Sequence, residues 1–187
     1  TAEDYYDTKV EDFASFANEI GTVFFEEKNI NSEKIVKQLK ESEAEIGISV
    51  NWPFVLKEEI CRALPLGILN GHAGDLPRYR GNATPNWAIL NGEDKIGLCV
   101  HSMEPNRLDS GPILTKDFLK ITADSYIGDV YSWMDQRLPE LFSESINGLA
   151  EGTIVPEPQS ENSDLTLRCY PRRPEDNEIN WKDTSEN

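Results

Sequence analysis

Three side chains that could act together on a carbonyl group lie just after two apolar runs. Asn70 and His72 end the run that begins at Gly67, and Asp109 lies in the turn-rich segment 106–112. An asparagine amide can donate to negative charge on a carbonyl oxygen, a histidine can move a proton, and an aspartate can orient an imidazole and stabilise its cation. This set needs no side-chain nucleophile if the substrate brings its own amine. Because ligands of open α/β sheets bind at strand ends, we expect the three side chains to converge there.

The two histidines of the chain have different settings. His72 precedes a segment rich in glycine and proline, 73–81, where the backbone bends and a substrate can approach. Alone, it would more often be a buried histidine that bonds a carbonyl, and Asp109 is what favours the catalytic interpretation. His101 lies inside the apolar run 98–102, away from any turn, so we expect a structural role for it.

The segment that begins at Asn70 resembles a signature of the folate-dependent formyltransferases, Asn-x-His-x-Ser-Leu-Leu-Pro-x-Tyr-Arg-Gly. These enzymes also share a later Asp-x-Gly, which Asp109 and Gly111 match. The resemblance runs from Ile46 to Trp181. The residues that fall on the first signature are Asn70, His72, Leu76, Pro77, Tyr79, Arg80 and Gly81.

The resemblance implies transfer of a formyl group from 10-formyltetrahydrofolate to an amine, without a metal. Asn70 and a protonated His72 would stabilise the oxyanion, and Asp109 would tune His72. The folate is expected to lie against two groups of residues, Phe54, Val55 and Leu56 in one and Arg107 and Leu108 in the other. Residues expected at the acceptor are Tyr79, Arg80, Trp87 and Arg172. The resemblance also implies a cis peptide bond between Leu76 and Pro77.

Among these enzymes, the chain looks most similar to sugar-nucleotide N-formyltransferases. Asn86 and Trp87 after the signature, and the stretch 172–181, resemble enzymes that formylate 4-amino sugars for cell-envelope polysaccharides such as lipopolysaccharide. The resemblance therefore implies an amino-sugar nucleotide as acceptor. Two alternatives stay open: a methionyl-tRNA formyltransferase, and a non-catalytic protein that binds folate or a nucleotide.

The charge balance bears on this choice. The chain has 18 basic and 34 acidic residues and a formal net charge of −16. A nucleic-acid surface needs a basic patch to replace phosphate counterions, so we expect no nucleic-acid partner. Arg168, Arg172 and Arg173 suit a diphosphate better than a polynucleotide.

Two positions depart from the signature. Gly74 stands where the family usually has Ser, and Asp75 stands where it usually has Leu. We expect this loop to be more polar and more flexible than usual. Asp75 itself is expected to be a solvated turn carboxylate, because Asp is common in turns for local hydrogen-bonding reasons.

Composition predicts a single α/β unit in the cytoplasm. The length of 187 residues and the 38% hydrophobic content can build one core. No apolar run is long enough to span a bilayer, so we expect no membrane insertion, and no charged-then-apolar leader is present. The three cysteines are widely spaced and predict buried thiols rather than a disulfide or zinc framework. A homodimer is left open.

Helical and strand patterns alternate, which predicts a Rossmann-like, mostly parallel sheet with flanking helices. Helices are predicted from Val10 to Ile20, after the cap Ser32, over 57–63, from the cap Thr84 and Pro85, and from Asp124. Strands are predicted at 22–25, 46–50, 67–70, 96–103 and 113–121. The long helix after Asp124 carries an apolar stripe that is expected to pack on the core.

We assign residues 1–160 to a formyltransferase catalytic domain that is incomplete at its N-terminus, because a doubly wound fold normally opens on a strand and turn. The family's first strand–helix–strand region is expected to be missing. Residues 161–187 are expected to begin a C-terminal region whose further module is absent.

Overall fold

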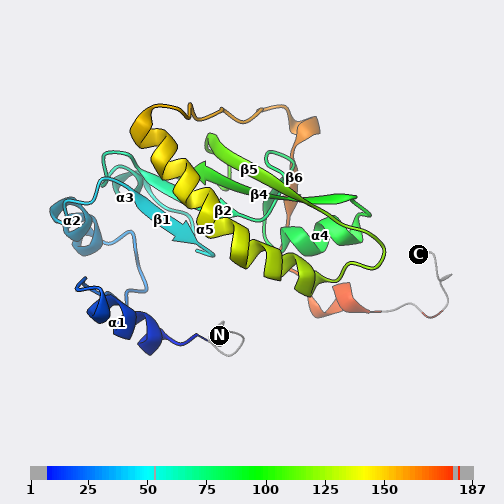
Figure 1. The fold of residues 1–187 in the computed structure, drawn as a ribbon, viewed down its shortest axis with the longest axis horizontal. Helices are drawn as coiled ribbons and strands as arrows, with labels where there is room; N and C mark the ends of the chain where they lie inside the picture. The colour runs from blue at the N-terminus through cyan, green and yellow to red at the C-terminus, as the bar shows by residue number, and fades with distance from the viewer. Residues whose placement is uncertain (1–7, 53, 179–180, 182–187) are drawn as a thin grey trace.

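The computed structural model describes residues 8–52, 54–178 and 181. Its centre is a four-stranded sheet with the order β1-β2-β4-β5 (Figure 1). These strands are β1 (Gly47–Val50), β2 (Ile68–His72), β4 (Lys95–Ser102) and β5 (Ile113–Lys120). A second, two-stranded sheet joins β3 (Tyr79–Gly81) to β6 (Leu167–Cys169) in parallel.

Five α-helices accompany the sheets, namely α1 (Val10–Glu19), α2 (Glu33–Glu41), α3 (Glu58–Cys61), α4 (Thr84–Leu90) and α5 (Ile127–Glu151). Two 3₁₀ turns, η2 (Ser163–Leu165) and η3 (Pro174–Asn177), follow near the C-terminus. The predicted α/β class with flanking helices is confirmed. In the described part of the chain, no helix combines the length and apolar character that crossing a membrane requires.

The strand directions in the central sheet differ from a mostly parallel arrangement. Only β1 and β2 are parallel, whereas β2 pairs with β4, and β4 with β5, in antiparallel fashion. The loop 103–112 returns the chain directly from β4 to β5, and such a short return fixes an antiparallel neighbour. Alternation of helices and strands along the sequence therefore did not translate into parallel pairing throughout.

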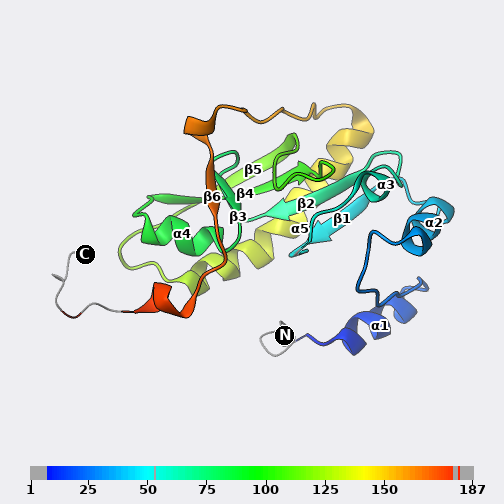
Figure 2. The same cartoon turned by 180° about the vertical axis from the view of Figure 1, so that it is seen from behind.

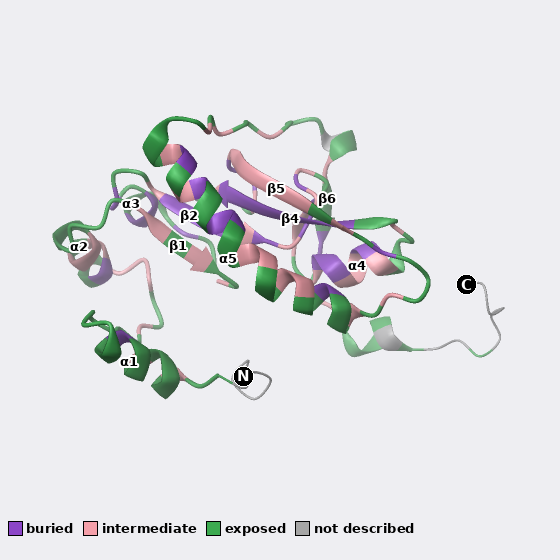
Figure 3. Ribbon diagram, viewed as in Figure 1, coloured by how far each residue is buried: buried purple, intermediate pink, exposed green. Residues whose placement is uncertain are grey.

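The two faces of the central sheet are covered differently. Helix α5 lies across one face, where Leu69, Leu98 and Val100 pack against Leu141 and Phe142 (Figure 1). The opposite face is visible in Figure 2, with α3 and the β3–β6 pair on that side. Because side chains alternate along a strand, residues next to Leu69 and Val100 must point to this second face. Figure 3 shows that β2 and β4 are the most deeply buried strands.

Several predicted elements are confirmed with small shifts. Ser32 caps α2 through its hydroxyl, which accepts from the Ile35 N–H at 3.4 Å. Helix α5 begins at Ile127 rather than at Asp124, because Ser125 folds back to the Thr122 N–H in a turn at 2.9 Å. Helix α4 is capped by Ala83 instead of Thr84, and the Thr84 hydroxyl donates to the Ala73 carbonyl.

The predicted strand at 22–25 is wrong. These residues have no regular structure, and Val23 is 71% exposed. A strand needs a neighbour for its backbone hydrogen bonds, and no strand of the described residues pairs with this segment.

The loop after His72 makes hydrogen bonds to β2 and β4. The Gly74 N–H donates to the His72 carbonyl at 3.1 Å, and the Cys99 thiol donates to the Gly74 carbonyl at 3.0 Å. Asp75 is paired with Lys116 at 2.9 Å, so it is not the solvated turn carboxylate that we expected. The peptide bond between Leu76 and Pro77 is cis, as predicted, and all three cysteines are buried free thiols.

Gly71 tests how tightly α5 covers the sheet. A Cβ at this position would lie 2.7 Å from a Leu138 methyl and 3.2 Å from the Phe142 ring. We expect Gly71→Val to lower the free energy of unfolding by about 1–3 kcal/mol through overpacking. Gly128→Val is the matched control, because nothing lies within 4 Å of a Cβ there, and its effect should stay within about 0.5 kcal/mol. Urea unfolding measures both, and equal effects would contradict this packing.

Candidate functional site

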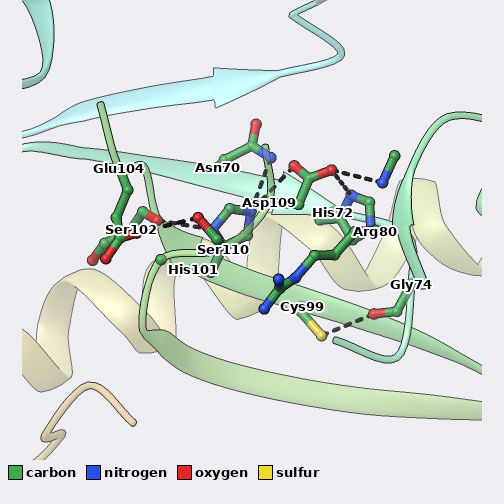
Figure 4. Close-up of polar contacts among 12 residues, drawn as sticks. Asn70, His72, Gly74, Arg80, Cys99, His101, Ser102, Glu104, Asp109 and Ser110 are labelled. Carbon is green, nitrogen blue, oxygen red and sulfur yellow. Dashed lines mark hydrogen bonds and ion pairs between the residues drawn. The ribbon is translucent and has the colours of Figure 1, made fainter. Parts of the chain in front are cut away.

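Strand β2 delivers two polar side chains to the face that α5 does not cover. Asn70 and His72 are two residues apart, so they share one face while Leu69 points to the helix. Both are buried, with 8% and 7% of their surface exposed. Figure 4 shows them beside Asp109.

Asp109 comes from the loop between β4 and β5, where its backbone is left-handed with φ +44°. Its Oδ2 accepts from the Gly81 N–H at 2.9 Å and lies 3.6 Å from His72 Nδ1. Its Oδ1 lies 3.7 Å from Nε2 of His101. The expected convergence of Asn70, His72 and Asp109 on one site is therefore confirmed.

The Asp109 carboxylate stays charged although it is largely buried. Burial alone would raise its pKa, but hydrogen bonding to His101 and the Gly81 N–H, together with the positive charge that His72 or His101 carries when protonated, outweighs burial and holds the pKa below its usual range. A buried negative charge is thus fixed between two imidazoles.

The His72 ring has one defined donor. Its Nε2 lies 2.6 Å from the Tyr79 carbonyl, which can only accept, so Nε2 carries the hydrogen. Burial lowers the pKa of the imidazole, as do His101 and Arg80, although Asp109 and the Tyr79 carbonyl act in the opposite direction. Burial therefore favours the neutral ring, in which Nε2 carries the hydrogen and Nδ1 faces Asp109.

Gly74 makes room for this arrangement. A Cβ at residue 74 would lie 2.6 Å from His72 Nε2 and would collide with the Tyr79 carbonyl. The departure from the signature at Gly74 thus accompanies the hydrogen bond between His72 and Tyr79. It does not loosen the loop.

His101 is the residue that the sequence interpretation missed. Antiparallel pairing sets it directly opposite Asn70, and it is only 1% exposed. Its Nδ1 donates to the Ser102 carbonyl at 2.8 Å, and its Nε2 accepts from the Asn70 amide at 3.2 Å. This contact fixes which way the Asn70 amide faces. The strand register that reveals this contact could not be read from the sequence.

The residues expected at the folate lie on adjoining loops. Phe54 and Val55 are 62% and 47% exposed, and Phe54 meets Trp52 edge-on at 5.9 Å. The Leu56 carbonyl accepts from the Asn106 N–H at 2.9 Å, which joins this loop to the segment that carries Arg107 and Leu108. The Leu56 side chain itself packs in the core with Ile60 and Leu64, so the structure does not bring it to a ligand surface.

The residues expected at the acceptor are distributed more widely. The Tyr79 hydroxyl donates to Glu93 at 2.6 Å, so its carbonyl and not its side chain reaches His72. The Trp87 indole donates to the Tyr170 carbonyl at 2.8 Å. Its ring is half-buried against the hydrophobic cluster that contains Tyr79 and Ala88. Arg80 lies beside Asp109 (Figure 4) and lines a cavity of about 250 Å³ with Arg107.

Arg172 is half-buried beyond β6 and does not line that cavity. Residues 179 and 180, in the stretch that resembles sugar-nucleotide enzymes, lie outside the described residues. Over the described ranges, no three His, Cys, Asp or Glu side chains are grouped so as to hold a metal ion.

Comparison with known proteins shows the family of this chain. The model of the formyl transferase family matches residues 6–146. A methionyl-tRNA formyltransferase from Trichlorobacter lovleyi is 33% identical over 75% of this chain and 43% of its own length. A methionyl-tRNA formyltransferase from Citrifermentans bemidjiense is 39% identical over 62% of this chain and 35% of its own. The chain belongs to the formyl transferase family, and it spans less than half the length of these relatives.

Solved structures share the fold at lower identity. Methionyl-tRNA formyltransferase from Clostridium thermocellum has a TM-score of 0.66 at 20% identity and covers 96% of this chain and 76% of its own. A formyltransferase from Anoxybacillus kamchatkensis, solved with UDP-4,6-dideoxy-4-formamido-L-AltNAc and tetrahydrofolate, has a TM-score of 0.62 at 16% identity. It covers 86% of this chain and 82% of its own.

The hydrogen bonds of the two histidines require opposite tautomers. We expect long-range ¹H–¹⁵N correlation spectra near pH 7.5 to show His72 protonated at Nε2 and His101 protonated at Nδ1. Because this chain has only two histidines, a His101→Gln variant assigns the signals. Identical tautomers for both rings, or a doubly protonated His101, would contradict the site described here.

Proposed function

We propose that the protein transfers a formyl group from 10-formyltetrahydrofolate to a primary amine. The observation that carries this proposal is the buried contact of His72 Nδ1 with Asp109 at 3.6 Å, with Asn70 on the same face of β2. Binding alone would not need an imidazole held beside a buried carboxylate. Membership of the formyl transferase family supports the same conclusion.

The folate would fit against the loop that precedes α3. Phe54 and Val55 present exposed apolar surface there, and the Leu56–Asn106 hydrogen bond ties this loop to the one that carries Asp109. An apolar surface with a few polar groups suits a flat pterin ring. Leu108 completes the proposed contact surface, whereas Arg107 lines the cavity beside Asp109 together with Arg80. When bound, 10-formyltetrahydrofolate supplies the formyl carbon.

The side chains divide the reaction between them. One N–H of the Asn70 amide is used by His101, which leaves the second to donate to the carbonyl oxygen as it gains negative charge. His72 Nδ1 accepts the proton that the amine loses as its bond to the formyl carbon forms. Asp109 stabilises the resulting imidazolium. The proton then passes to N10 of the folate as the bond between N10 and the formyl carbon breaks.

An amino-sugar nucleotide is the acceptor that we favour. The formal charge of −16 makes a broad polyanion surface unfavourable. The Anoxybacillus neighbour was solved with a formamido sugar nucleotide, which supports this acceptor class and a role in cell-envelope polysaccharide synthesis.

Methionyl-tRNA is the second candidate acceptor. Relatives at 33% and 39% identity are methionyl-tRNA formyltransferases, so the net charge alone does not exclude a nucleic-acid partner. A local basic surface can serve an acidic protein, and the arginines near Asp109 provide one.

One incubation series separates these functions. The protein is given 10-formyltetrahydrofolate with a panel of amino-sugar nucleotides or with methionyl-tRNA, and mass spectrometry detects the gain of a formyl group. Formylation of a sugar nucleotide supports the favoured acceptor, and formylation of methionyl-tRNA supports the second. No formylation of any acceptor, with folate still bound, would overturn the enzyme assignment and favour a binding protein.

The proton-transfer role of His72 has a kinetic signature. His72→Ala should lower turnover by about a hundredfold or more, the scale for losing a general acid–base group, while folate affinity stays nearly unchanged. Turnover of the wild type should rise with pH through the His72 pKa, because the neutral ring is the active form. Near-normal turnover in His72→Ala would refute this role.

Asp109→Asn tests the partner of His72 separately. The amide keeps the shape but no longer stabilises the cation, so the pKa of His72 should fall. The acid limb of the pH–rate profile should therefore move to lower pH while maximal turnover decreases. An acid limb that moves to higher pH would contradict the assigned electrostatics.

A further inference from the structure

Positively charged side chains line a cavity of about 250 Å³ beside Asp109, although the chain as a whole is acidic. Three arginines line it, Arg80 from β3, Arg107 from the β4–β5 loop and Arg168 from β6. Ser110, the neighbour of Asp109, also lines it. The β3–β6 pairing sets Arg80 directly alongside Arg168 in register. Residues nearly ninety positions apart in the sequence thus form one basic wall.

Arg80 is held in place without being neutralised. Its Nε and Nη2 donate to the side-chain oxygen of Gln159 at 3.1 and 2.7 Å. The Gln159 amide in turn donates to the carbonyls of Asp109 and Gly111 at 3.0 and 2.7 Å. A neutral amide therefore fixes the guanidinium against the catalytic loop and leaves its charge for a ligand.

The charges of Arg80 and Arg107 lie close enough to repel each other. Burial lowers the pKa of Arg80, and the positive charge of Arg107 lowers it further, although Asp109 and Glu104 act in the opposite direction. Among the described residues, Arg80 and Arg168 have no carboxylate within ion-pair distance. Arg168 instead lies over the Tyr170 ring at 5.8 Å.

Arg107 is the one arginine of the cavity with acidic partners. Glu104 lies 3.0 Å from it and also accepts from the Ser110 hydroxyl at 3.2 Å. The second partner, Glu161, is 3.8 Å away and has an 85% exposed side chain, so water screens this pair. Glu104 is therefore the carboxylate that would compete with an anion for this cavity.

We propose that this cavity binds a phosphate or diphosphate group of the amine acceptor. Guanidinium groups bind phosphate oxygens in pairs of parallel hydrogen bonds, and three of them around one space match a diphosphate. Whole small-molecule pockets measure about 300–1,000 Å³, so this smaller cavity suits one group of the acceptor. An anion bound beside Ser110 would anchor the acceptor next to Asp109 and His72. That the bound phosphate belongs to the amine acceptor rests on the proposed function.

Binding of inorganic pyrophosphate by titration calorimetry tests the cavity without requiring activity. Arg107→Gln and Arg168→Gln should each weaken pyrophosphate binding about tenfold, the scale of one charged hydrogen bond. Glu104→Gln should strengthen it, because the competing carboxylate is removed. Arg62→Gln is the matched control, since Arg62 is the residue that follows α3, pairs with Glu58 and lies outside the cavity, and it should leave binding unchanged.

Steady-state kinetics then identifies the source of the anion. Arg168→Gln should raise the KM for the acceptor about tenfold and leave kcat and the folate KM unchanged. If Arg168→Gln instead raised the KM for folate, and only for folate that carries its glutamate tail, the proposal would be overturned. The cavity would then bind the carboxylates of that tail. Pyrophosphate affinity that none of the three cavity variants changes would also overturn the proposal.

The two proposals fail in different ways. Arginine-dependent pyrophosphate binding without formyl transfer to any amine would reject the enzyme assignment and keep the anion site. Formyl transfer with an unchanged acceptor KM in Arg107→Gln and Arg168→Gln would reject the anion site alone.

Discussion

Antiparallel pairing of β2 with β4 is the constraint on which the candidate site depends. It sets Asn70 opposite His101 and His72 opposite Cys99. Since α5 occupies the other face through Leu69, these polar side chains have only one face available. A slip of β2 by one residue would turn Asn70 and His72 towards α5 and away from His101 and Asp109. The pairing that builds the core therefore also assembles the site.

Asp109 completes the site because its loop is fixed through the backbone. Gln159 bonds to the carbonyls of Asp109 and Gly111, and the Gly81 N–H bonds to the carboxylate itself. Gly111 is required here, since a Cβ would collide with the Ser102 carbonyl. A buried carboxylate is costly unless it is paired and hydrogen-bonded. Here His72 of β2, Gly81 of β3 and His101 of β4 lie around the Asp109 carboxylate. The loop holds its charge in place before any ligand binds.

The sequence predicted the parts of this arrangement that local chemistry determines. Residue types and spacing identified Asn70, His72 and Asp109, and periodicity located most helices and strands. What it missed depends on long-range pairing. His101 was expected to be structural because it lies away from any turn, and only the register reveals its contact with Asn70. The lack of space for a Cβ at Gly74 likewise depends on the position of the Tyr79 carbonyl, which a sequence pattern does not reveal.

The proposed reaction depends on Asn70 to stabilise charge on the formyl oxygen during transfer. Single-turnover rates for Asn70→Ala, measured with isotopically labelled formyl donor and saturating acceptor, test this role directly. We expect a rate about a hundredfold or more below that of the wild type, with the donor still bound and the protein still folded. A rate within a few-fold of the wild type would contradict it.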